Sequence, residues 1–184
     1  MLSVLCEVML CSACLWAGTI SLKDRQGWRA AGFLLIAVTA LMGALVFAGL
    51  EQVRPAHQFL SGVSARIALL LIAVGCLRRI SQRLLLVAAL ACLLWVPNQW
   101  ALAGNLLALI AIAWPGRSQR WSLAVAGSLL FAFAGLVVGS RGEWQGIARQ
   151  DLYHLTLMLA ALSWGIARLV STGPQSRLPT PLAR

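Results

Sequence analysis

The sequence predicts an all-α, polytopic membrane protein: a bundle of seven transmembrane helices with its N-terminus outside and its C-terminus in the cytoplasm. The 184-residue chain is 60% hydrophobic and 11% charged, whereas a soluble domain carries about 25% charged residues. The apolar residues form seven segments, and most of the 15 Lys and Arg residues lie in every second gap between them. A chain of this composition can cover its surface only in lipid.

Each apolar segment is a candidate span, because a helix needs about 20 apolar residues to cross a hydrocarbon core about 30 Å thick. In chain order the segments are 2–21, 28–50, 58–77, 80–96, 99–114, 121–139 and 150–170. The fourth and fifth are short, and Pro97-Asn98 favours a tight turn, so we expect them to form a helical hairpin. Residues 1–170 then make one transmembrane domain. Residues 171–184, with three prolines, make a disordered cytoplasmic tail.

The basic residues predict the orientation, because cytoplasmic loops are enriched in Lys and Arg. The gaps after the first, third and fifth spans, together with the C-terminal end, hold Lys23, Arg25, Arg29, Arg78, Arg79, Arg83, Arg117, Arg120, Arg168, Arg177 and Arg184. The other gaps hold only Arg54, Arg141 and Arg149. This asymmetry favours an odd number of crossings of a bacterial inner membrane. Because the charge lies at helix ends rather than in one patch, we expect the lipid bilayer as partner and no nucleic acid.

With this orientation, most of the acidic residues and both histidines lie toward the external side. Glu7 is inside the first span, where an ionisable group costs about 2.5 kcal/mol or more and usually faces the bundle. One interpretation is a structural ion pair between Glu7 and Arg66, which lies at similar depth in the third span. The alternatives are that Glu7 is solvated and that Arg66 extends to outer lipid phosphates.

Asp151 and His154 begin the seventh span and, three residues apart, share one helical face. A carboxylate in this position can orient an imidazole. The structural alternative is that Asp151 caps the helix and His154 is an interfacial histidine. Glu7, Asp151 and His154 are thus the candidate catalytic residues. With His57 they also supply enough ligands for a zinc site, which takes three protein ligands and a water, although their spacing is not a known signature.

The segment Asp151-Leu-Tyr-His-Leu-Thr-Leu-Met-Leu-Ala-Ala resembles the last helix of an uncharacterised family of bacterial seven-span membrane proteins. Leu5-Cys6-Glu7 is similar to the first helix of that family, and residues 28–49, with Gly43 near their end, to the second. The family is distantly similar to the superfamily of alkaline ceramidases and progestin/adiponectin receptors, seven-span hydrolases that bind zinc through three histidines. The resemblance implies a seven-helix fold.

By position, the resemblance matches Glu7 to the first-helix acid and His154 to one zinc ligand. The sequence departs from the pattern elsewhere. Val46, Phe47 and Ala48 stand where a second-helix histidine is expected, and Met158 stands where the last helix has its second histidine. A complete three-histidine zinc site is therefore not expected.

Two functions follow from these patterns, and they leave open whether the chain is an enzyme. The first is a non-catalytic or degenerate hydrolase-like protein, a receptor or complex subunit with a lipid or small-molecule ligand or a membrane protein partner. The alternative is a metal-dependent, membrane-embedded hydrolase of lipid amides or esters, with metal-bound water as nucleophile and Glu7 or Asp151 as base. A transporter ranks third because broken helices and repeats are not evident.

Overall fold

The computed structural model describes residues 1–75 and 80–169, apart from the side chain of Asn98. Arg78, Arg79 and the predicted tail 171–184 lie outside these residues. The described chain is mostly helical, as predicted. Its elements are α1 (Leu2–Lys23), α2 (Gly27–Phe47), the 3-10 helix η1 (Glu51–Val53), α3 (Arg54–Val74), α4 (Ile80–Trp95), α5 (Asn98–Ala113), α6 (Trp121–Phe133), the π-helix η2 (Ala134–Val138), the strands β1 (Glu143–Trp144) and β2 (Ile147–Ala148), and α7 (Arg149–Ala167).

Four helical stretches of the described chain are long and apolar enough to cross a membrane: Leu2–Lys23, Gly27–Phe47, Glu51–Val74 and Trp121–Val138. The helices α4 and α5 are apolar but have 16 residues each, which is about 24 Å at 1.5 Å per residue. Local chemistry sets several ends. Pro55 stands in the first turn of α3, where a missing N–H costs nothing, and Gly75 ends α3 with a φ of 69°.

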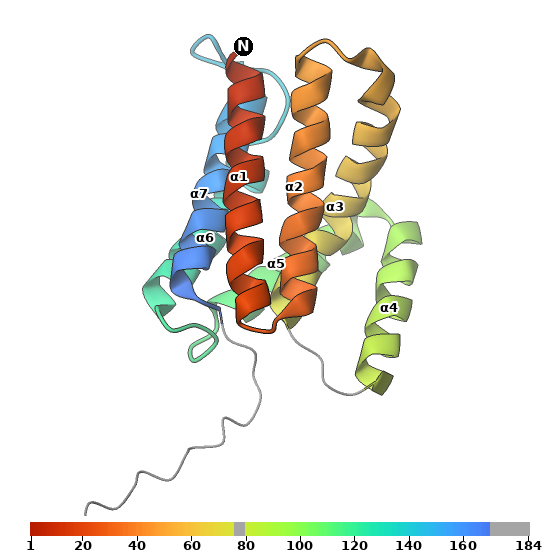
Figure 1. The fold of residues 1–184 in the computed structure, drawn as a ribbon, viewed down its shortest axis with the longest axis vertical. Helices are drawn as coiled ribbons and strands as arrows, with labels where there is room; N and C mark the ends of the chain where they lie inside the picture. The colour runs from red at the N-terminus through yellow and green to blue at the C-terminus, as the bar shows by residue number, and fades with distance from the viewer. Residues whose placement is uncertain (76–79, 170–184) are drawn as a thin grey trace, which may run out of the picture.

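The helices α1, α2, α3, α6 and α7 lie side by side as a bundle, and α5 crosses behind them in Figure 1. Small residues bring the backbones together, as is usual for helices in lipid. At Gly32 of α2, an added Cβ would stand 2.7 Å from the Ala68 carbonyl oxygen of α3. At Gly127 of α6, a Cβ would stand 2.7 Å from the indole of Trp164 in α7. These close approaches fix how the helices are rotated.

The predicted hairpin of the fourth and fifth segments is wrong in its packing, although the turn at Pro97 is present. Of the helices described, α4 packs mainly on α3, and it does not pack along α5. No residue of α4 is buried. Figure 1 shows α4 standing apart from the bundle. The turn signal was sufficient to predict the break, but contact between the two helices depends on long-range packing.

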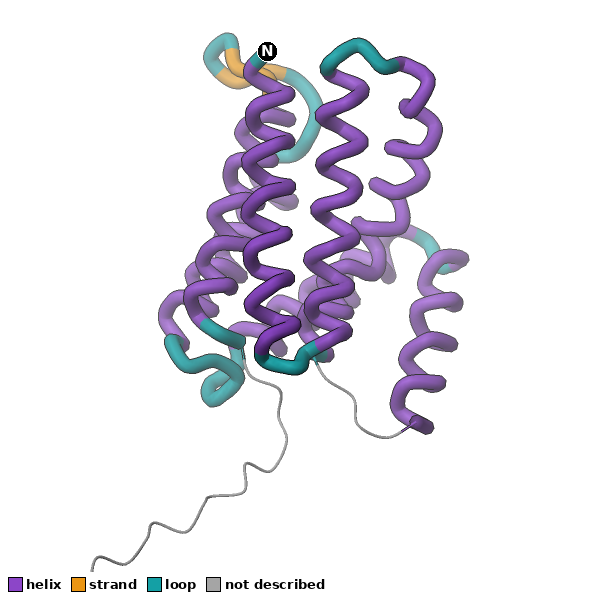
Figure 2. Tube along the Cα trace, viewed as in Figure 1, coloured by secondary structure: helices purple, strands orange, loops and turns teal. Residues whose placement is uncertain are grey.

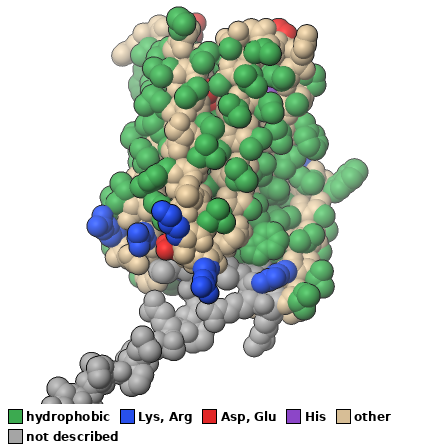
Figure 3. Space-filling model, viewed as in Figure 1, with side chains coloured by type: hydrophobic (Ala, Val, Ile, Leu, Met, Phe, Trp, Pro, Cys, Tyr) green, Lys and Arg blue, Asp and Glu red, His purple; other side chains and the backbone are tan. Residues whose placement is uncertain are grey.

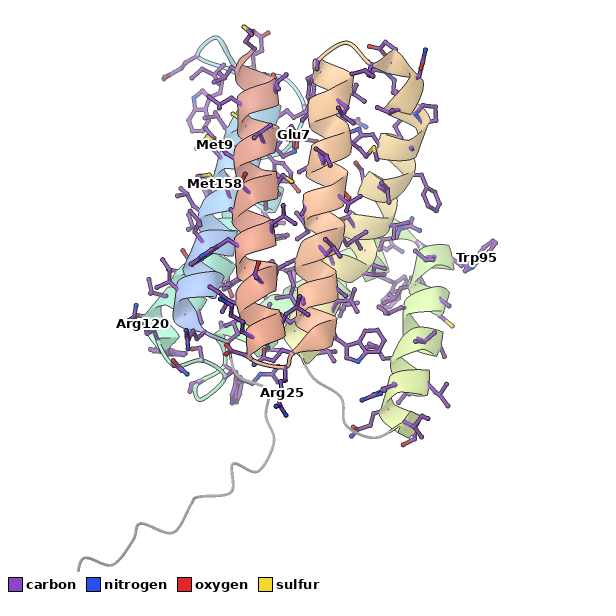
Figure 4. All side chains as sticks on the ribbon, in the orientation of Figure 1. Glu7, Met9, Arg25, Trp95, Arg120 and Met158 are labelled. Atoms are coloured by element: carbon purple, nitrogen blue, oxygen red, sulfur yellow. The ribbon has the colours of Figure 1, made fainter. Side chains whose placement is uncertain are left out.

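The two ends of the bundle differ in charge. Lys and Arg gather at the end where α1 joins α2, while hydrophobic side chains cover the rest of the visible face in Figure 3. We call this the basic end; Arg25 and Arg120 lie there in Figure 4. The N-terminus and the β1–β2 hairpin lie at the opposite end, as Figure 2 shows. Glu7 lies toward that opposite end.

A buried arginine ties the helices together at the basic end. Arg29 is only 2% exposed, so its guanidinium must find partners inside the protein. Its Nε donates to the Ile72 carbonyl (2.8 Å) near the end of α3, and one terminal nitrogen donates to the Leu169 carbonyl (2.5 Å) just after α7. Arg117 donates to the Ala73 carbonyl. Cations at helix C-termini are electrostatically favoured, so Arg29 has a structural role here beyond marking topology.

Candidate functional site

A cavity of about 660 Å³ lies within the bundle, in the half that contains Glu7. Pockets that hold drug-sized ligands measure about 300–1,000 Å³. Its walls come from α1, α2, α3, α5, α6, η2 and α7, and many of its residues are apolar, including Leu10, Ile36, Leu69, Leu109 and Leu157. Among the polar groups on the wall are Glu7, His57, Ser61 and His154. An apolar cavity with a few convergent polar groups is the usual form of a small-molecule site.

Glu7 and His154 form the centre of the polar wall. Glu7 is 1% exposed, and its Oε1 lies 3.3 Å from Nδ1 of His154. Neither of these two atoms has a hydrogen-bond partner among the described residues. A buried carboxylate in this condition has lost its water without gaining a full set of donors. The pair is therefore available to a bound molecule that donates hydrogen bonds.

His57 joins this pair from the start of α3. A Cβ added at Gly43 would overlap the carboxylate of Glu7 and stand 3.2 Å from Nε2 of His57. Glu7 and His57 thus meet over the bare backbone of α2, which only glycine allows. Nε2 of His57 also lies 3.3 Å from the Ser61 hydroxyl, one turn further along α3. We call Glu7, His57, Ser61 and His154 the polar cluster.

Asp151 is close to the polar cluster but does not line the cavity. It is 4% exposed, and its Oδ1 has no hydrogen-bond partner among the described residues. The predicted helix cap is wrong: Ala148 is the N-cap residue of α7, and Asp151 lies in the first turn. A carboxylate there is still favoured by the helix dipole.

Arg66, predicted as one partner of Glu7, is directed elsewhere. Its guanidinium donates to the carbonyl of Leu94, in the last turn of α4. The carboxylate of Glu7 instead lies against the imidazole of His154. Similar depth in the two helices suggested that Glu7 and Arg66 pair, but their side chains lie on helix faces that meet different neighbours.

Two members of the site were not among the predicted site residues. Ser61 follows His57 by four residues, so the two share a helical face, and this spacing could have identified it. Gly43 entered only through a family resemblance, because one glycine among the 16 in the chain carries little signal by itself. Its role depends on a side chain from another helix, which a linear sequence does not display.

The predicted zinc ligands do not assemble into a metal site. Within residues 1–75 and 80–169, no group of three or more His, Cys, Asp or Glu side chains is arranged to hold a metal ion. Glu7 and His154 approach each other, His57 approaches them over Gly43, and Asp151 stays off the cavity wall. The residues present do not fit the tetrahedral set of a catalytic zinc. The arrangement offers instead one carboxylate, two imidazoles and one hydroxyl.

Comparison of this chain with protein families, curated proteins and solved structures finds no match.

Proposed function

We propose that this chain is a membrane-embedded binding protein that holds an amphipathic molecule in its cavity, with the polar end of that molecule on Glu7, His57 and His154. One observation carries the proposal. A carboxylate that is 1% exposed, with an oxygen that accepts no hydrogen bond in the described chain, borders a cavity of about 660 Å³. A receptor or a subunit of a larger complex would use such a site.

The chemistry of the cluster defines the ligand. A carboxylate accepts hydrogen bonds, and each neutral imidazole offers one donor and one acceptor. The polar end of the ligand must therefore donate, as a hydroxyl, an amide N–H or an ammonium does. The apolar walls favour a hydrocarbon body.

The proposal includes an orientation: N-terminus outside, C-terminus inside, in a bacterial inner membrane. The basic end of the bundle supports it, since Lys and Arg are enriched on the cytoplasmic side. An odd number of crossings follows. The count is seven if α4 and α5 both cross, and five if they enter and leave on one side. Similarity to the alkaline ceramidase and progestin/adiponectin receptor superfamily also remains a proposal, motivated by the Asp151–His154 run.

Binding of a fluorescent short-chain ceramide, an N-acyl amino alcohol, to the protein in lipid nanodiscs tests the proposal. We expect saturable binding. In Glu7→Gln the affinity should fall about tenfold, because the ligand loses one charge-assisted hydrogen bond. The control is Glu143→Gln, because Glu143 is exposed on β1. Equal binding by both variants, or none by the parent protein, would contradict the proposal.

A second candidate function is hydrolysis of a lipid ester or amide. The contact of 3.3 Å between Glu7 and His154 favours it, since a carboxylate beside an imidazole is a common acid–base arrangement. Incubation of the purified protein with the same ceramide, followed by chromatography for free fatty acid, tests it together with metal analysis. Product formation that is lost in His154→Ala and Glu7→Gln would favour the enzyme. Turnover unchanged in both variants would exclude catalysis by this cluster.

A further inference from the structure

One flank of the bundle carries exposed side chains that also line the cavity. Leu102 and Leu106 of α5 and Leu136 of η2 line the cavity, yet they are 48%, 38% and 60% exposed. These three exposed side chains lie where α5 and η2 border the cavity. The helix α5 packs on both α3 and α6, but in the described chain α3 does not pack along η2. The flank between α3 and η2, beside α5, is thus a side on which the cavity can open to the lipid.

The helices α4 and α5 are short for a membrane crossing. Each is about 24 Å long, against about 30 Å for the hydrocarbon core. In Figure 1, α4 lies beside the basic end of the bundle, with its lower end beyond the α1–α2 turn and its upper end alongside the bundle. Trp95 ends α4 and lies in Figure 4 at a level between Glu7 and Arg25.

A helix that stops inside the hydrocarbon leaves backbone carbonyls without partners, which is tolerated only where protein groups satisfy them. Arg66 meets this need, because it donates to the Leu94 carbonyl in the last turn of α4. A cation at a helix C-terminus is also favoured by the helix dipole. Asn105 of α5 donates to the Ala65 carbonyl of α3 at 2.7 Å, and this hydrogen bond attaches α5 to α3. The unusual depth of Arg66 in the sequence thus has a physical reason.

We propose that α4 and α5 form a re-entrant pair, and that the cavity above them takes an aminophospholipid directly from the outer leaflet. The ammonium of the headgroup meets Glu7, and its phosphate meets Arg141, which also lines the cavity. The acyl chains leave through the opening over Leu106 and Leu136. This inference rests on the proposed binding function and adds the class of ligand, its source and its route.

Cysteine labelling tests the re-entrant pair. Trp144→Cys, Trp95→Cys and Trp114→Cys are matched changes at the proposed external, internal and cytoplasmic levels. A membrane-impermeant maleimide applied to intact spheroplasts should label only Trp144→Cys, and permeabilisation should add only Trp114→Cys. The unmodified protein, with its native cysteines, is the blank. Labelling of Trp95→Cys from outside, at the level of Trp144→Cys, would overturn the re-entrant arrangement.

Photo-crosslinking tests the lipid and its route. The protein is placed in nanodiscs that contain traces of phosphatidylethanolamine or phosphatidylglycerol with a diazirine on one acyl chain. We expect crosslinks to α5 and η2 with the amine lipid, reduced about tenfold with phosphatidylglycerol, which lacks the ammonium. Leu136→Trp should block the opening and remove these crosslinks. Leu129→Trp is the matched control, because Leu129 is 65% exposed on α6 but does not line the cavity.

The results of these crosslinking experiments distinguish a wrong lipid or route from a wrong binding function. If Glu7→Gln removes the crosslinks but Leu136→Trp does not, the cavity binds lipid and the sideways route is refuted. If phosphatidylglycerol crosslinks as well as the amine lipid, the proposed headgroup is wrong. If neither Glu7→Gln nor Leu136→Trp changes the crosslinks, they come from bilayer lipid that surrounds the protein and not from lipid in the cavity. The proposed binding function is then refuted as well.

Discussion

Two buried charged side chains, near opposite ends of the bundle, meet opposite conditions. Arg29 is 2% exposed and donates to the carbonyls of Ile72, near the end of α3, and Leu169, just after α7. Glu7 is 1% exposed, yet its Oε1 accepts no hydrogen bond from the described chain and faces the nearby imidazole of His154. Both charges cost free energy to bury.

The difference separates a structural role from a functional one. A buried charge with internal partners holds elements together, whereas one with unused hydrogen-bonding capacity beside a cavity is available to a ligand. This comparison predicts that stability depends on Arg29 and that binding depends on Glu7.

Arg29→Met should lower the free energy of unfolding by about 3 kcal/mol, because two buried carbonyls would lose a charged donor. Chemical unfolding of the detergent-solubilised protein measures this change. Arg25→Met is the control, since Arg25 is exposed at the same end, and its unfolding midpoint should stay where it is. An Arg29→Met variant as stable as the parent protein would show that Arg29 does not hold the helices together.

Gly43→Ala should weaken ceramide binding and lower stability by about 1–3 kcal/mol, because its Cβ would overlap the Glu7 carboxylate. Gly62→Ala is the matched control: Gly62 lies within α3, and a Cβ there meets nothing within 4 Å. In that variant we expect unchanged binding and a gain of up to about 1 kcal/mol from helix propensity. Equal behaviour of the two alanine variants would mean that Glu7 does not need the bare backbone of α2.

Glu7→Gln should raise the free energy of unfolding by about 1 kcal/mol while it reduces binding, because a neutral amide costs less to bury than a charge. Thermal unfolding without ligand, alongside the binding assay, separates the two effects. Loss of stability in this variant would show that Glu7, like Arg29, is a structural charge.

Gln26→Leu should cost only about 1 kcal/mol. The Nε2 of Gln26 donates to the Leu169 carbonyl at 2.8 Å, but Arg29 donates to the same oxygen and would remain. Unfolding of the double variant Gln26→Leu with Arg29→Met tests whether the two donors compensate for each other at the Leu169 carbonyl. A double variant whose loss equals the sum of the single losses would indicate that the two donors act independently.

Sequence patterns predicted most of the helices, and the structure differs mainly at their ends. Every predicted segment contains a helix, because apolar length and turn signals are local properties. The start of α3 at Arg54 rather than residue 58 reflects Pro55, which is compatible with a first helical turn. The end of α6 differs because the chain passes into the π-helix η2, and a π turn has no clear local signature.

The candidate site was predicted in part. Glu7, His57 and His154 were identified by residue type and depth, and all three line one cavity. Asp151 was expected beside them and lies off the cavity wall, while Ser61 was not expected and lies on it. Arg66 was matched to Glu7 by depth alone, whereas its contact is with Leu94. Depth can be read along one helix, but partners depend on how several helices are turned.

The amino-acid pattern alone was enough to predict that this chain is helical, that its helices are apolar enough for lipid, and that its basic residues favour one side. These properties are sums over neighbouring residues, so they need no knowledge of the fold. Three other features arise only from the folded chain: Glu7 meets His154, α4 leaves the bundle, and α5 lines a cavity. Those outcomes depend on close approaches such as Gly32 on Ala68 and Gly43 on Glu7, which join residues far apart in the chain.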